Sequence, residues 1–222
     1  TAIPRRATTQ KIRGGVQRIM DQSYCLRLNR YLIQMVTFRV ADRSDYKNIA
    51  ELHAKSWQQN YRGTFSDNFL NEEVHRERLA VWEERFLLPS ENQYVLLVEE
   101  DGMLLGFCCA YIDENDSYGS YLDNLHVSSK ANGRGLGTLL MQKLVEEINR
   151  CHGMDKLYLW VLDTNEAAID FYERLKGRRE ETIKADDIGD TEFWKVRYVW
   201  DSLRILEECI NTKLEQYERR RI

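Results

Sequence analysis

The stretch Tyr121–Leu140, YLDNLHVSSKANGRGLGTLL, constrains the fold more than any other. Its first part, residues 121–127, predicts a buried strand, and its last part has the leucine spacing of a helix. Between them lie Gly133, Gly135 and Gly137. Alternating glycines let consecutive backbone N–H groups converge, and the helix that follows adds the positive end of its dipole. The stretch therefore predicts a strand–loop–helix site for a phosphate or pyrophosphate.

Two common phosphate-binding motifs do not fit this loop. A P-loop needs a lysine directly after its glycines, and none stands there. The dinucleotide fingerprint G-x-G-x-x-G needs a glycine at position 138, which is Thr138. Taken alone, the segment also allows a glycine-rich turn without a ligand.

A second segment, Leu157–Gly177 (LYLWVLDTNEAAIDFYERLKG), narrows the choice. It again predicts a strand followed by a helix, with Asn165 before the helix and Phe171-Tyr172 within it. Together the two segments resemble the GNAT superfamily of acyl-CoA-dependent N-acyltransferases, in its small bacterial type. In that family [QR]-x-x-G-x-[GA] binds the CoA pyrophosphate and N-x-x-A-x-x-F-Y follows it. The resemblance covers residues 36–200 and implies an α/β fold with a mixed, largely antiparallel central sheet, flanked by helices on both faces.

The periodicity of the chain agrees with a mixed α/β layer structure. The pattern predicts strands at 36–41, 94–99, 103–112, 121–127, 157–162 and 191–200, with a weaker one at 178–184. The pair Asp101-Gly102 predicts a hairpin turn between the second and third of these strands. It predicts a helix from Ser44 to Trp57, a longer one from Ser66 to Pro89, and helices after each of the two motif loops. No linker divides residues 36–200, so we expect one acyltransferase domain. A basic extension, residues 1–35, would precede it, and an extra C-terminal amphipathic helix, residues 201–222, would follow.

Composition limits the classes of function. The longest apolar run, Met103–Ile112, is too short to span a bilayer of ~30 Å, and the five cysteines have no C-x-x-C spacing. These features predict a cytoplasmic protein without a membrane partner or a metal site. Residues 1–35 hold seven basic side chains and one acid although the whole chain has a net charge of −4. The acidic remainder argues against nucleic-acid binding. The basic extension is interpreted as lying outside the domain, with a targeting segment or an RNA-binding arm as alternatives.

The resemblance implies acetyl-CoA as co-substrate and assigns residues to it. The backbone of the strand at Leu125, His126 and Val127 would pair with the pantetheine arm, and Asn165 would contact that arm from the facing strand. The loop that would hold the pyrophosphate comprises Asn132, Gly133, Arg134, Gly135, Leu136, Gly137 and Thr138. Asn132 stands where the family has Gln or Arg, which shortens one side chain of the site.

The resemblance also implies two catalytic groups. Tyr172 would protonate the departing thiolate, since a phenol of pKa near 10 can donate to a thiolate whose thiol has a pKa near 8.5; the alternative is a core aromatic. Asp123 is the predicted base, with a salt-bridged aspartate as the alternative. Strict alternation would place Tyr121 and Asp123 on one face with Leu125 and Val127. His126 would then point to the other face as a structural histidine.

The predicted activity is transfer of an acetyl group from acetyl-CoA to a primary amine by direct attack in a ternary complex. Trp57, Tyr61 and Arg62, expected in the loop between the first two helices, would border the acceptor. The acceptor could be a small molecule, a peptide N-terminus or a lysine, and the acidic chain is compatible with cationic acceptors such as polyamines or aminoglycosides. Alternatives are a catalytically silent CoA-binding or regulatory module and an enzyme for another acyl-CoA. The apolar stripe of the C-terminal helix would pack on the domain itself or form a homodimer.

Overall fold

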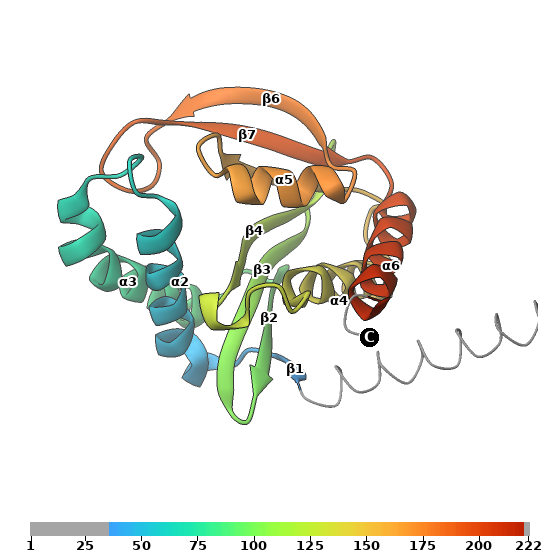
Figure 1. Cartoon of the computed structure of the whole chain (residues 1–222), viewed down its shortest axis with the longest axis horizontal. Helices are drawn as coiled ribbons and strands as arrows, with labels where there is room; N and C mark the ends of the chain where they lie inside the picture. Colours follow the sequence, from blue (N-terminus) through green and yellow to red (C-terminus); the bar gives the residue numbers. More distant parts are fainter. Residues whose placement is uncertain (1–35, 220–222) are drawn as a thin grey trace, which may run out of the picture.

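The computed structural model describes residues 36–219, and side chains through residue 216, so the predicted basic extension lies outside the described residues. Seven strands in this part form one sheet in the order β1-β2-β3-β4-β5-β7-β6 (Figure 1). Every neighbouring pair is antiparallel except β4 and β5. The strands are β1 (Thr37–Val40), β2 (Gln93–Glu100), β3 (Met103–Asn115), β4 (Gly119–Val127), β5 (Leu157–Leu162), β6 (Arg178–Ala185) and β7 (Phe193–Trp200).

Helices cover both faces of this sheet, which confirms the predicted mixed, largely antiparallel α/β architecture. On one face lie α2 (Tyr46–Asn60) and α3 (Val74–Leu87), and on the other α4 (Leu136–Arg150), α5 (Glu166–Arg174) and the C-terminal α6 (Leu203–Arg219) (Figure 1). Short helical turns are η1 (Arg43–Asp45), η2 (Phe69–Glu73) and η3 (Ser129–Ala131). No helix within residues 36–219 is both long and apolar enough to cross a membrane.

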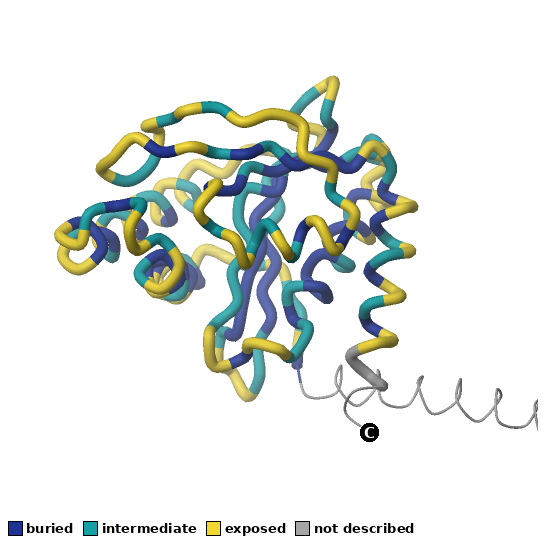
Figure 2. The backbone as a smooth tube through the Cα atoms, turned by 45° about the horizontal axis from the view of Figure 1, so that its top comes forward, coloured by how far each residue is buried: buried dark blue, intermediate teal, exposed yellow. Residues whose placement is uncertain are grey.

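The largest core cluster lies between the sheet and α4, α5 and α6. The apolar stripe of α6 joins it through its buried residues Leu203, Leu206, Ile210 and Leu214. The stripe is thus used by the chain's own core, which was one of the two predicted alternatives. Figure 2 shows the contrast between the buried central strands and the largely exposed outer strand β6.

The β2–β3 hairpin confirms the predicted turn. Asp101 and Gly102 both adopt positive φ, 50° and 76°. Two consecutive residues with φ above zero make a turn whose twist matches that of the flanking strands, and Asp-Gly favours it.

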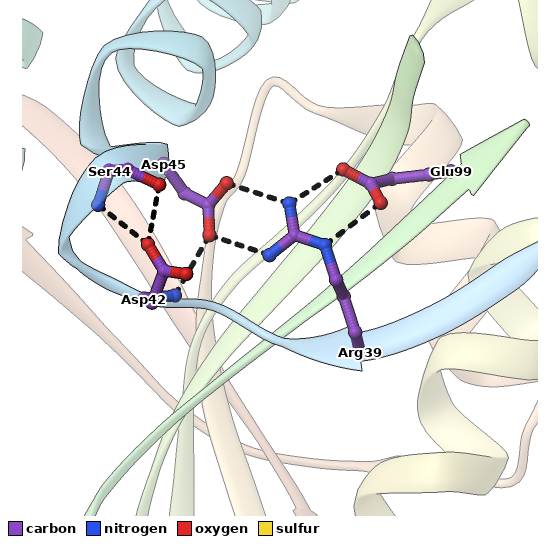
Figure 3. A network of polar contacts seen from close by, with 5 residues as sticks. All are labelled: Arg39, Asp42, Ser44, Asp45 and Glu99. Atoms are coloured by element: carbon purple, nitrogen blue, oxygen red, sulfur yellow. Dashed lines mark hydrogen bonds and ion pairs between the residues drawn. The ribbon is translucent and has the colours of Figure 1, made fainter. Parts of the chain in front are cut away.

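The start of the first helix differs from the prediction. Asp42, rather than Ser44, caps the helical turn η1, because the backbone N–H of Ser44 donates to Asp42 Oδ1 at 2.7 Å. Asp45 completes a capping box by accepting from the Asp42 N–H at 2.8 Å. Arg39 of β1 then bridges Asp45 at 2.7 Å and Glu99 of β2 at 2.7 Å, which ties η1 to the sheet (Figure 3).

The second predicted helix is divided. Ser66 Oγ accepts from the Phe69 N–H at 3.1 Å, so the hydroxyl caps the turn at the predicted start of this helix. The chain then makes the wide turn η2 before α3 begins at Val74, and α3 ends at Leu87, just ahead of Pro89.

Candidate active site

The site begins where β4 and β5 separate. These strands pair only between Ser120–Leu122 and Leu157–Leu159. From Asp123 onward β4 keeps its hydrogen bonds to β3 but has no strand on its other edge among the described residues. Its backbone N–H and C=O groups there are free to bind an extended ligand.

A cavity of about 620 Å³ opens along this free edge. It is lined by most of the predicted site residues, which come from α2, β4, the glycine loop and α5. These are Trp57, Tyr61, Asp123, Leu125, His126, Val127, Asn132, Gly133, Gly137, Asn165 and Tyr172. Sequence reasoning missed several further lining residues, chiefly His53, Ser56, Arg78, Arg85, Trp160 and Lys195.

The glycine loop has the backbone that the sequence predicts. Gly133 and Gly135 take φ of 74° and 80°, and α4 starts at Leu136 without a side-chain cap. The N–H groups of the first turn of α4 are therefore open to an anion. Leu136 and Thr138 are buried, so their side chains serve packing. The Arg134 guanidinium pairs with Glu100 of β2 at 2.5 Å and does not line the cavity. Its hydrogen bonds lower the pKa of Glu100.

A β-bulge in β4 changes which face of the sheet its side chains occupy, relative to the prediction. Cys109 of β3 pairs with Asn124, and the next residue of β3 pairs with Leu122, so Asp123 has no partner. Arg85 Nη1 of α3 donates to both Asp123 at 2.6 Å and Asn124 at 3.0 Å, which puts both on the α2/α3 side.

Beyond the bulge the alternation is reversed relative to the prediction. Leu125 and Val127 pack on the cluster with α4, whereas His126 lies against His53 of α2, with ring centroids 4.4 Å apart. The expectation that Asp123 shares a face with Leu125 and Val127 is therefore wrong. His126 lines the cavity on the same side as Asp123.

The Asp123 carboxylate is engaged by two neighbours. It forms the ion pair with Arg85 and accepts from the Tyr121 hydroxyl at 3.2 Å. Burial, followed by the negative charge of Asp123, raises the pKa of Tyr121, so this phenol stays protonated. The predicted base is thus a salt-bridged carboxylate at the cavity wall.

His126 is a neutral imidazole. Burial, and then the charge of Arg78, lower its pKa to about 3. Its Nδ1 shares a hydrogen bond of 2.8 Å with Ser56 Oγ. Its Nε2 has no hydrogen-bond partner among residues 36–216 and is not sealed from solvent, so it is accessible from the cavity.

Tyr172 of α5 and Tyr61 at the end of α2 both line the cavity. The Tyr172 side chain is almost buried, and its hydroxyl has no protein hydrogen bond in the described part of the chain. Burial, with the neighbouring Tyr61, raises the pKa of Tyr172. Burial raises the pKa of Tyr61 to about 12, against a hydrogen bond with Asn165 that lowers it.

Of the three residues predicted to border the acceptor, Trp57 and Tyr61 line the cavity and Arg62 does not. Trp57 lies in the last turns of α2 and Tyr61 is its C-cap, rather than both lying in a loop, because α2 continues to Asn60. Arg62 turns away and pairs with Asp67 at 2.6 Å and with Asn71 at 2.6 Å. It does not line the cavity. The described residues contain no group of three or more His, Cys, Asp or Glu placed to hold a metal ion.

Comparisons with known proteins agree with this geometry. The chain belongs to the acetyltransferase (GNAT) family, whose model matches residues 46–177. It is therefore an acyl-CoA-dependent N-acyltransferase. Uncharacterized N-acetyltransferase YuaI of Bacillus subtilis is 26% identical over 80% of this chain and 99% of its own length. Uncharacterized N-acetyltransferase MJ1207 of Methanocaldococcus jannaschii is 27% identical over 69% of this chain and 65% of its own length.

Solved structures share the fold. PaiA N-acetyltransferase from Thermoplasma acidophilum, in complex with coenzyme A, aligns with a TM-score of 0.59 at 15% identity. The alignment covers 74% of this chain and 99% of that one. YncA from Salmonella typhimurium, with its cofactor acetyl-CoA, aligns with a TM-score of 0.52 at 22% identity, over 74% of this chain and 92% of the other.

Proposed function

We propose that the protein transfers an acetyl group from acetyl-CoA to a primary amine by direct attack in a ternary complex. One observation carries the proposal. A single cavity joins the glycine loop and the free edge of β4 to the Tyr172 hydroxyl and to Asp123 and His126. A cofactor arm and an acceptor could therefore meet inside it.

The residues present fit a CoA ligand. The loop from Asn132 to Thr138, with positive φ at Gly133 and Gly135, offers backbone N–H groups and a helix N-terminus to the pyrophosphate. The unpaired edge of β4 at residues 125–127 offers backbone partners for the pantetheine amides. Asn165 caps α5 by accepting from the Ala168 N–H at 3.2 Å, which leaves its side-chain NH₂ for the arm or for Tyr61. Arg134 is held by Glu100, so the backbone would dominate phosphate binding.

In the proposed reaction the amine nitrogen attacks the thioester carbonyl carbon and forms the C–N bond. The C–S bond then breaks, the thiolate takes the Tyr172 proton, and the amine gives a proton to a base. We retain Asp123 as that base, acting directly or through a water. His126 is the second candidate because its Nε2 is free at the cavity wall. Arg78 and Arg85 line the same cavity, and their charge would lower the pKa of a bound ammonium.

Residues 36–200 would form the catalytic domain in this proposal, and α6 would complete its core. The acceptor would enter on the α2/α3 side, past Trp57 and Tyr61. Trp57 stacks on Phe65 with ring centroids 5.3 Å apart, so it is a fixed part of the wall.

Calorimetric titration of the full chain tests the proposal. We expect micromolar binding of acetyl-CoA but not of ATP or NADH, followed by thiol release when an amine panel is added. Propionyl-CoA and succinyl-CoA in the same assay test the acyl preference. Binding without transfer to any amine would favour a silent CoA-binding module. Failure to bind any CoA thioester would contradict the proposal, because the glycine loop would then be only a turn.

A further inference from the structure

One face of α3 supplies two guanidinium groups to the cavity. Arg78, Trp82 and Arg85 are spaced by four and three residues, so they project from the same side of the helix toward α2 and the sheet. Trp82 is fully buried and donates from Nε1 to His53 Nδ1 at 3.0 Å. Trp82 therefore fixes the orientation of the α3 face that carries Arg78 and Arg85.

The carboxylates of the cavity are already occupied. Its lining contains two acids, Asp123 and Asp187. Asp123 pairs with Arg85 at 2.6 Å, and Asp187 pairs with Lys195 at 2.5 Å, and both of these cations also line the cavity. No lining carboxylate in the described part of the chain is left to receive a second ammonium group of an acceptor. Because the lining carboxylates are already paired with cations, polyamines are disfavoured as acceptors.

Arg78 retains an unused donor. Its side chain is only 7% exposed, and its guanidinium lies over the Trp57 ring, 4.2 Å from the centroid. Its Nε and Nη2 donate to Glu77. Its Nη1 bonds to no described residue, yet it is not sealed from solvent. Because the residue lines the cavity, this N–H is presented there. A desolvated, stacked guanidinium is a strong partner for a carboxylate oxygen.

A second unpaired donor lies within the same wall, but it is sealed from solvent. His53 Nδ1 accepts from Trp82, so the proton of the neutral ring is on Nε2. That Nε2 is buried without a partner among residues 36–216. The exposed unpaired donor of this wall is thus the Arg78 N–H, and its positive charge favours a ligand that brings negative charge.

The spacing of the site favours a compact ligand. Arg78 lies over Trp57, whose ring centroid is 5.3 Å from that of Tyr61. Tyr61 and Tyr172, the proposed acid, line the same cavity. The free guanidinium N–H and the reacting centre therefore share one cavity of about 620 Å³, in which a small ligand that carries both an amine and a carboxylate could meet both.

We propose that the acceptor is a small amine that also bears a carboxylate, as a free amino acid does, and that Arg78 binds this carboxylate. The inference rests on the proposed acetyl transfer. A polyamine, an internal peptide lysine or a peptide N-terminus has no carboxylate at this distance.

Matched pairs of acceptors test the inference on the wild-type enzyme. Thiol release is followed with each free amino acid and with the amine that results from removing its carboxylate, and with spermidine. Loss of a charged hydrogen bond predicts that kcat/KM falls on the order of 10- to 100-fold for the decarboxylated member. If the decarboxylated amines or spermidine are acetylated as fast as the amino acids, or faster, the inference that the acceptor bears a carboxylate is wrong.

Variants locate the carboxylate contact. In Arg78→Gln the preference within each pair should collapse to within about threefold, chiefly through KM. Arg78→Lys should restore part of it, since the charge remains and the second N–H is lost. Arg76→Gln, which removes an exposed charge from the same helix, is the matched control and should keep the wild-type preference. A full preference in folded Arg78→Gln protein would overturn the role of Arg78.

The two proposals fail differently. If acetyl-CoA binds but no carboxylate-bearing amine is acetylated, the inference about the acceptor is wrong and the cofactor site stands. If acetyl-CoA does not bind, the proposed function itself is wrong.

Discussion

Ser56 Oγ and His126 Nδ1 lie 2.8 Å apart, and this hydrogen bond joins α2 to β4 at the cavity wall. Asn60 Nδ2 also donates to Ser56 Oγ, at 3.2 Å, and to the Ser56 carbonyl at 2.8 Å. The serine hydroxyl is therefore held in place, and it fixes the histidine ring with Nε2 accessible from the cavity. Two groups on β4, Asp123 and His126, thus compete for the role of base.

Asp123→Asn and His126→Gln separate these candidates. If Asp123 accepts the amine proton, its asparagine variant should lose about 10²- to 10⁴-fold in kcat/KM, whereas His126→Gln should lose less than tenfold. The measurement is kcat/KM against pH for both variants at saturating acetyl-CoA. The opposite ranking would assign the base to His126. Because Asp123 also pairs with Arg85, thermal melting of Asp123→Asn must show an intact fold.

Tyr172→Phe tests the acid. The phenylalanine keeps the buried ring against Tyr198 and Trp200 but removes the hydroxyl, so packing is retained. We expect acyl transfer to slow at least about tenfold while acetyl-CoA affinity changes little. Stopped assays for transfer and calorimetry for binding measure the two quantities. Tyr94→Phe, a change to a tyrosine outside the cavity, should leave both at wild-type values. Unchanged transfer in Tyr172→Phe would show that another group protonates the thiolate.

Much of the fold was predictable because its signals are local. Asp101-Gly102 fixes the β2–β3 turn through backbone preference alone, and the glycine loop is set by positive φ at Gly133 and Gly135. The weak outer strand β6 also forms, although its exposed, charged residues give little alternation. The Ser44 cap was wrong because Asp42, two residues earlier, offers a carboxylate to the same turn.

The site was harder to predict because it depends on contacts between distant segments. The bulge at Asp123 reverses the alternation of β4, and a pattern of period two cannot show where one residue is inserted. Arg78 and Arg85 reach the cavity only because Trp82 between them is buried against His53. In the sequence, the one sign that Arg78 and Arg85 share a helix face is their separation of seven residues, with Trp82 between them.

Gly133→Ala should weaken acetyl-CoA binding. Gly133 has φ of +74°, which strains any residue with a Cβ by about 1–2 kcal/mol, although no atom lies within 4 Å of the added carbon. Relaxation of that strain would turn the loop N–H groups away from the pyrophosphate, so we expect about a tenfold higher Kd. Calorimetric titration measures it. Gly102→Ala is the matched control, with φ of +76° and equally open space in the hairpin turn. An equal loss of affinity in both variants would assign the effect to general destabilisation.

Asp45→Asn should destabilise the fold without affecting the active site. Asp45 is 5% exposed, closes the capping box of η1 and accepts from Arg39. We expect a loss of about 1–3 kcal/mol in the free energy of unfolding; Arg39 is 39% exposed, which limits the ionic part through solvent screening. The hydrogen bond from Arg39 lowers the pKa of Asp45, so its stabilisation is present above the usual carboxylate pKa and is lost as pH falls through the lowered value. Denaturant melts of this variant and of exposed Asp116→Asn, which should behave as wild type, measure the difference.

His53 and His126 should make the protein less stable in mild acid. Burial lowers the pKa of His126 to about 3 and that of His53 well below its ordinary value. Between pH 6.5 and these lowered values the unfolded chain binds more protons than the folded one, so stability falls as pH decreases from about 6.5.

The limiting slope is about 1.4 kcal/mol per pH unit for each histidine. The window between pH 7 and 5 isolates this contribution, since it lies above the ordinary carboxylate pKa values near 4. His126→Gln should flatten the pH dependence of the unfolding free energy in that window by up to one such slope. His152→Asn, at an exposed turn outside the cavity, is the matched control for replacing a histidine. A wild-type slope in His126→Gln would mean that His126 can be protonated in the folded protein, and it would then be available to the reaction as a cation as well as a base.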